Sequence, residues 1–169
     1  MLWIALCLLL ATGAFAQKSK HPVKAHEHGT AQINIVVDGK TALVELESPA
    51  EGILGFEHEA RTPVHKQQQE TALNTLRKRI NEIVIFHSSA GCGFTAKKAE
   101  VVKEAGEEHS EVHAVFDVSC ARPIVGTSLQ FGMTRVFPRI HDVKVQILNG
   151  SQQTGMDVKD NIGSVLFTK

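Results

Sequence analysis

The chain has 169 residues, and its 18 Lys and Arg balance its 18 Asp and Glu, so the formal net charge is zero when the histidines are neutral. A neutral chain offers no basic field that would attract nucleic acid or anionic lipid. Aromatic residues make up 5% of the chain and Tyr is absent, so a stacking surface for bases or sugars is not indicated.

The first residues have the pattern of a secretion signal. Residues 2–10 are almost entirely apolar, and Ala14-Phe15-Ala16 has the small-x-small pattern that precedes cleavage by signal peptidase. The apolar run is too short to span a membrane. We therefore expect a signal peptide over residues 1–16, a flexible segment over residues 17–25 and a single domain over residues 26–169, exported from the cytosol.

Two cysteines, Cys92 and Cys120, remain after this cleavage. A pair of cysteines in an oxidising compartment favours a disulfide. The alternative is a pair of zinc thiolates, but neither cysteine has another Cys or a His at the ligand spacing of two to four residues. The sequence therefore predicts a Cys92–Cys120 disulfide.

A β-hairpin is the first predicted element of the domain. Apolar residues alternate with polar ones on both sides of an Asp38-Gly39 turn: Ile33, Ile35, Val37, Ala42, Val44 and Leu46. Pairing about this turn places Ile35 opposite Ala42. One face of the hairpin is then apolar, and the other carries polar residues that include Glu47.

A long helix is predicted from residue 63 to about residue 86. Thr62 is a favourable N-cap, and Pro63 suits the first helical position. Apolar residues recur through this segment at helical spacing: Leu73, Leu76, Ile80, Ile83 and Val84. Residues 48–61, which precede the helix, contain a proline and two glycines, and we expect them to form an ordered loop.

Further strands are expected over residues 94–102 and 111–120, within residues 137–148, and over residues 164–167, with a polar, Glu-rich loop over residues 103–110. In the second of these strands every other residue is apolar: Val112, Ala114, Phe116, Val118 and Cys120. The whole pattern predicts an α+β fold, with a mostly antiparallel β-sheet built from β-hairpins and one long helix packed on it.

The candidate functional residues are histidines and carboxylates. His26 and His28 lie at the start of the predicted domain, and imidazole is a preferred ligand of zinc. If the first strand extends back through Gly29, both histidines share a face with Glu47, which lies diagonal to His28. This arrangement predicts a two-histidine metal site with Glu47 or His58 as a further ligand. A solvated polar face near the N-terminus is the alternative.

His109 and His113 form a second candidate cluster. On a regular strand they lie about 13 Å apart, too far to share one ion. On the strand each histidine contributes only weakly or bridges to a second copy of the chain, whereas a loop that folds back lets both converge with Glu107 or Glu108 in a second site. Because the loop is short and acidic, we expect a weak, exposed second site. On a helix they have the zincin interval, but position 110 is Ser rather than the catalytic Glu, and we expect no enzyme. Three other histidines are assigned to structure: His65, His87 and His141.

A series of motifs resembles a known family. In chain order these motifs are Ala25-His26-Glu27-His28-Gly29, Leu46-Glu47-Ser48-Pro49-Ala50, Gly55-Phe56-Glu57-His58, Cys92, Cys120-Ala121-Arg122-Pro123 and Phe137-Pro138. The series is similar to the ZrgA-like periplasmic proteins, a zinc-regulated bacterial family. The resemblance implies a periplasmic zinc-binding protein that assists zinc acquisition, alongside a zinc ABC importer or its binding protein, and a structural disulfide.

One departure from this family concerns residues 103–110. Such proteins often carry a long His- and Asp-rich loop before the strand that leads to the second cysteine, whereas this stretch is short and holds only His109. The expected function is that of a non-enzymatic accessory protein that binds Zn²⁺ through His26 and His28. A metal-free envelope module that binds a protein partner remains the alternative.

Overall fold

The structure is a computed structural model, and it describes residues 28–103 and 109–167. The expected signal peptide, the expected flexible segment, His26 and the acidic residues Glu107 and Glu108 lie outside the described residues.

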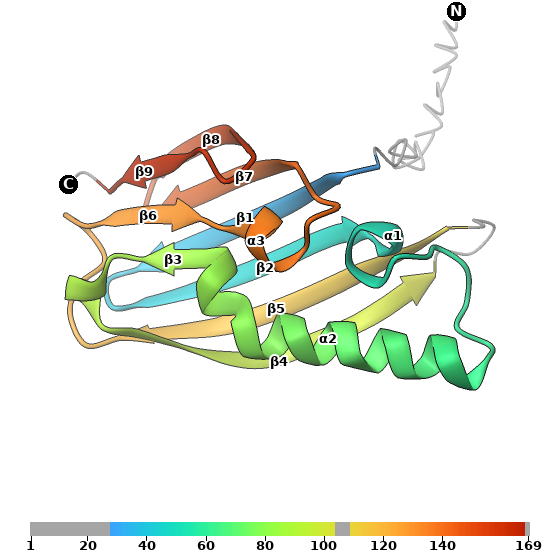
Figure 1. Cartoon of the computed structure of the whole chain (residues 1–169). Coiled ribbons are helices and arrows are strands. Elements are labelled where there is room, and N and C mark those ends of the chain that lie inside the picture. Colours follow the sequence, from blue (N-terminus) through green and yellow to red (C-terminus); the bar gives the residue numbers. More distant parts are fainter. Residues whose placement is uncertain (1–27, 104–108, 168–169) are drawn as a thin grey trace, which may run out of the picture.

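A six-stranded sheet forms one layer of the molecule (Figure 1). From one edge to the other, its strands are β4 (Cys92–Lys103), β5 (Ser110–Cys120), β2 (Thr41–Pro49), β1 (Thr30–Asp38), β7 (Asp142–Asn149) and β8 (Gln152–Lys159). Strands β1 and β7 run parallel, and the other neighbouring pairs of this sheet are antiparallel. The predicted α+β class with a mostly antiparallel sheet is therefore confirmed.

The second layer consists of helices and a small sheet that lie over one face of the large sheet (Figure 1). Its elements are α1 (Ala50–Leu54), α2 (Pro63–Ile83), β3 (Val84–Phe86), η1 (Ser88–Ala90), β6 (Ser128–Phe131), α3 (Met133–Val136) and β9 (Ser164–Leu166). The small sheet has the order β3-β6-β9. No helix in the described ranges is long and apolar enough to cross a membrane.

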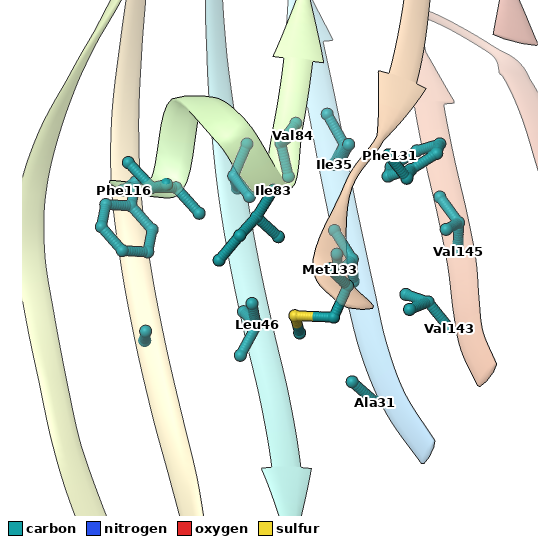
Figure 2. Close-up of a cluster of buried hydrophobic side chains, with 14 of the residues drawn as sticks. Ala31, Ile35, Leu46, Ile83, Val84, Phe116, Phe131, Met133, Val143 and Val145 are labelled. Atoms are coloured by element: carbon teal, nitrogen blue, oxygen red, sulfur yellow. The ribbon is translucent and has the colours of Figure 1, made fainter. Parts of the chain in front are cut away.

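The hydrophobic core lies between these two layers. Figure 2 shows Ile35, Leu46, Phe116 and Val145 on the large sheet, together with three residues of the second layer: Ile83, Phe131 and Met133. All seven side chains are at most 1% exposed. Full burial of such a side chain stabilises the fold by roughly 1.5 to 3 kcal/mol. The opposite face of the large sheet is left partly exposed.

The alternating apolar faces predicted for the strands are confirmed. Along β5 every second residue is buried: Val112, Ala114, Phe116, Val118 and Cys120. Cys92 of β4 lies directly opposite Cys120, and their sulfur atoms form the predicted disulfide, with an S–S distance of 2.08 Å. This bond ties the edge strand β4 to its neighbour.

Helix α2 begins where the sequence predicts. The side chain of Thr62 accepts a hydrogen bond from the backbone N–H of His65 at 3.1 Å, as an N-cap residue does. The helix ends at Ile83 rather than near residue 86. Residues Val84–Phe86 leave it because they pair with β6 as strand β3, so the predicted helix end is wrong by one turn.

The hairpin of β1 and β2 has a different register from the predicted one. Ile35 pairs with Val44 rather than Ala42, because the two residues of the turn are Gly39 and Lys40. Gly39 adopts a φ of +58°, which glycine reaches without strain. The shift is two residues, so each side chain stays on its predicted face.

The sequence does not predict several further elements, among them α1, β6 and β8. Residues 48–61, predicted to be a loop, include helix α1 directly after β2. Strand β8 follows the hairpin turn after β7, and β6 lies between the disulfide region and α3. Strand β8 lacks a clear alternation of apolar residues, which explains why the sequence pattern did not reveal it.

Candidate metal site at Glu57

The side chain of Glu57 lies between two histidines that are far apart in the sequence. Nδ1 of His28 is 3.1 Å from Oε1 of Glu57, and Nδ1 of His109 bonds to the other carboxylate oxygen, Oε2. The side chain of Glu57 is 19% exposed, whereas the side chains of His28 and His109 are 67% and 48% exposed. We call these three residues the Glu57 cluster; its carboxylate is largely buried and its imidazoles face solvent.

The topology of the large sheet brings the three residues together. Strand β1 begins, β2 ends and β5 begins at the same end of the sheet, because β2 is antiparallel to both neighbours. His28 lies just before β1, His109 just before β5, and Glu57 in the loop that follows β2 and α1. The backbone N–H of Ser110 donates to the carbonyl oxygen of Glu57 at 3.2 Å, which holds this loop beside the start of β5.

The start of β1 is held by a glycine. Gly29 adopts a φ of +77°, and its carbonyl oxygen accepts hydrogen bonds from the backbone N–H groups of His141 at 2.9 Å and Asp142 at 3.1 Å. The strand begins at Thr30. The left-handed conformation at Gly29 turns the chain out of the direction of β1, so the position of His28 is set by this turn and not by the strand.

The expectation that the first strand extends back through Gly29 is therefore wrong, and with it the expected diagonal contact between His28 and Glu47. Glu47 lies on β2 with Gln32 and His113 as its neighbours on the adjacent strands. His28 instead lies beside Glu57. The metal ligands that the sequence predicts, including Glu47, remain predictions.

A second carboxylate and an arginine lie beside the cluster. Oε2 of Glu51, in α1, is 4.0 Å from Nδ1 of His28, and Oε1 of the same residue is 3.7 Å from Nε of Arg139. Gly55 ends α1 with a φ of +86°, and a Cβ atom there would lie 3.2 Å from a guanidinium nitrogen of Arg139. Glycine at this position thus allows Arg139 to pack against the loop that carries Glu57.

His58, predicted as a possible ligand beside His28, lies against other residues. Its ring stacks on Phe56 with a centroid distance of 5.0 Å, and its centroid is 4.7 Å from that of His65 at the start of α2. Nδ1 of His58 is 3.1 Å from the backbone carbonyl oxygen of Glu59.

His109 and His113 lie in different surroundings. His113 is on the regular strand β5, and its Nε2 is 2.9 Å from Oε2 of Glu111. Its cross-strand neighbours are Glu47 on β2 and Glu100 on β4. His109 lies before the strand and bonds to Glu57. The structure therefore matches the case in which these two histidines do not form one chelate.

The Glu57 cluster has the donor types that zinc prefers, two imidazole nitrogens and a carboxylate. Both rings direct Nδ1 at Glu57. A carboxylate in this position commonly orients an imidazole whose other nitrogen binds the metal. Within residues 28–103 and 109–167, no three His, Cys, Asp or Glu side chains surround a common point as ligands of an ion do. A bound ion therefore requires rotation of these side chains or a further ligand.

Sequence reasoning missed the part played by Glu57. This residue stands inside the motif Gly55-Phe56-Glu57-His58, in which the sequence favours the adjacent histidine as a ligand. Its contacts with His28 and His109 join three separate segments, and no local pattern reveals them. Its place inside one of the motifs that resemble a known family was the available signal.

The chain was also compared with known proteins. The family model described as ZrgA family zinc uptake protein matches residues 25–167. The chain belongs to this family. The ZrgA match includes all three residues of the Glu57 cluster and confirms the resemblance found in the sequence, and the family name links the chain to zinc uptake. A search of curated proteins finds no match to the chain.

Proposed function

We propose that this protein is a periplasmic, non-enzymatic accessory protein of zinc uptake, which binds Zn²⁺ at the Glu57 cluster. The observation that carries the proposal is the meeting of His28 and His109 on the carboxylate of Glu57. Membership of a zinc uptake family supports zinc as the ion, and the signal-like N-terminus supports export.

The charges around the cluster favour a divalent cation. Glu57 and Glu51 bring two negative charges, and Arg139 near Glu51 brings one positive charge. With neutral imidazoles the local sum is negative, and opposite charges attract more strongly at a partly buried carboxylate than in bulk water. His26 stands two residues before His28 in the sequence and is the further ligand that we propose.

The exposure of the imidazoles suits a site that exchanges its ion. Structural zinc sites are closed by four protein ligands, whereas open sites keep positions for water or another ligand. His28 and His109 are 67% and 48% exposed, so a partner can reach the ion. An open site of this kind fits delivery of zinc to an importer or to its binding protein.

A zinc competition titration with a chromophoric chelator tests this proposal on the tag-free mature chain. His109→Asn is compared with His113→Asn, a matched control four residues further along the same segment. We expect His109→Asn to weaken zinc binding about tenfold or more. We expect His113→Asn to leave the affinity of the tightly bound zinc ion unchanged. Equal affinities in both variants and the native protein contradict the proposed site.

The second candidate function is a metal-free module of the cell envelope that binds a protein partner. It is favoured by two exposed apolar residues that lie side by side on β1 and β7: Val36 is 45% exposed and Leu148 is 41% exposed. Capture of partners from an envelope extract, with and without a chelator, separates the two functions. Capture of one partner that does not depend on metal favours the second.

A further inference from the structure

A second pair of imidazoles lies in contact on the surface beside the Glu57 cluster. The ring centroids of His58 and His65 are 4.7 Å apart, and both rings pack on Phe56, with centroid distances of 5.0 and 4.9 Å. The pair lines an open hollow of about 470 Å³ together with Glu59, Arg61, Thr62 and Lys103. His58 comes from the loop after α1, and His65 from the first turn of α2.

The hydrogen bond of His58 fixes which of its nitrogens carries the proton. Nδ1 lies 3.1 Å from the carbonyl oxygen of Glu59, and a carbonyl oxygen only accepts hydrogen bonds. Nδ1 is therefore the donor, so in the neutral ring Nε2 keeps its lone pair. A ring that donates one N–H to a backbone carbonyl and offers its other nitrogen is the common state of a metal-ligating histidine.

The spacing of the two rings also suits a shared ion. With Zn–N bonds of about 2.1 Å and tetrahedral angles, the centroids of two zinc-bound imidazoles lie about 5 Å apart. The observed 4.7 Å is close to this value, and the rings are inclined at 44° to each other rather than stacked face to face. Binding of one ion by both rings requires side-chain rotation that directs the two Nε2 atoms at a common point.

We propose that His58 and His65 form a second zinc site, separate from the Glu57 cluster, with water completing the coordination. Glu59, which lines the same hollow, is the further carboxylate that we propose; its Oε2 accepts a hydrogen bond from Nε of Arg61 at 3.1 Å. The site takes borderline divalent ions such as Zn²⁺. It does not depend on zinc binding at the Glu57 cluster.

The charges around this pair make it the weaker of the two sites. Lys103 lines the same hollow, and the N-terminus of α2, where His65 lies, carries a partial positive charge. Glu59 forms an ion pair with Arg61, which offsets part of the negative charge that Glu59 brings to the site. A divalent ion is therefore repelled by Lys103, and removal of that charge should strengthen its binding.

Zinc titration of the full mature chain, carried out in a His28→Asn/His109→Asn background, isolates the second site. Calorimetry gives the affinity, and NMR spectra of the imidazole nitrogens show which rings bind zinc. We expect an ion whose binding shifts the Nε2 signals of His58 and His65. His65→Asn should lower the zinc affinity of this site about tenfold or more, and Lys103→Gln should raise it about two- to fivefold.

The matched control is His141→Asn, because His141 is an exposed histidine paired with Asp160. This change should leave the zinc affinity of the site unaltered. The proposal is overturned if His65→Asn does not change zinc binding in the background protein. It is also overturned if the Nε2 signals of His58 and His65 do not respond to zinc. In either case the pair serves only aromatic packing on Phe56. If the His28→Asn/His109→Asn variant binds zinc with the affinity of the native protein and the His65→Asn variant does not, the result supports this inference and contradicts the site at the Glu57 cluster.

Discussion

His28 and Glu57 are joined through their side chains, with Nδ1 of the histidine 3.1 Å from Oε1 of the carboxylate. The contact connects the turn before β1 with the loop after α1, and His109 completes it from the segment before β5. Residues from three separate segments thus meet at one end of the large sheet. The arrangement places a largely buried negative charge between two exposed imidazoles, which is the basis of the proposed zinc site.

Replacement of the central carboxylate should weaken zinc binding. Glu57→Gln removes the negative charge and replaces one of the two acceptor oxygens, each of which contacts one imidazole, with an NH2 donor. Loss of such a group typically costs about 10- to 100-fold in metal affinity. The measurement is competition with a chelator of known affinity. Glu70→Gln, a change on the exposed surface of α2, is the control and should bind zinc as the native protein does. An unaltered affinity in Glu57→Gln argues against the cluster.

The loop that carries Glu57 should depend on Gly55. Alanine at this position forces a side chain into a φ of +86° and brings Cβ to 3.2 Å from the guanidinium group of Arg139. We expect Gly55→Ala to lower the free energy of unfolding by about 1 to 2 kcal/mol, measured by urea denaturation. In Gly93→Ala, on β4, the new Cβ has no heavy atom within 4 Å, and stability should be unchanged. Equal stability of the two variants contradicts this explanation.

The disulfide should support stability but not metal binding. Cys92→Ala/Cys120→Ala removes a cross-link that closes a separation of 28 residues, and we expect the free energy of unfolding to fall by roughly 2 to 5 kcal/mol. Under conditions in which the variant stays folded, its zinc affinity should equal that of the native protein. Loss of tight zinc binding by the folded variant would instead indicate that the cysteines act as ligands.

His113 should not contribute to the tight site, because it lies on β5 with Glu111 as its partner rather than Glu57. Sedimentation velocity with and without zinc on the native protein and His113→Ala measures its role. We expect the zinc-bound native protein and the variant to have the same mass. Zinc-dependent dimers that form only in the native protein show that His113 bridges two chains.

The sequence predicts the elements whose side-chain periodicity is clear. Strand β5 alternates strictly, and α2 has a capping Thr62 before Pro63, so both are recognised correctly apart from the last turn of the helix. Strand β8 has no such alternation. The parallel pairing of β1 with β7 joins distant segments, and local patterns carry no information about it.

The sequence includes both histidines of the Glu57 cluster among its candidate ligands but does not reveal Glu57. His28 and His109 are candidates because imidazole is a good zinc ligand, but the sequence alone places them in different clusters. The positive φ of Gly29 turns His28 out of the expected strand direction, and the hydrogen bond from Ser110 brings Glu57 to His109. Both effects are tertiary, so the carboxylate that joins the two histidines emerges only from the fold.

The most direct test of the central claim is a crystal structure of the zinc-loaded protein with an anomalous difference map recorded at the zinc absorption edge. The account predicts a strong peak at a ligand distance of about 2.0 to 2.1 Å from an imidazole nitrogen of both His28 and His109, next to Glu57. A strongest peak that contacts neither histidine, or no peak near Glu57 in protein that carries zinc, contradicts it.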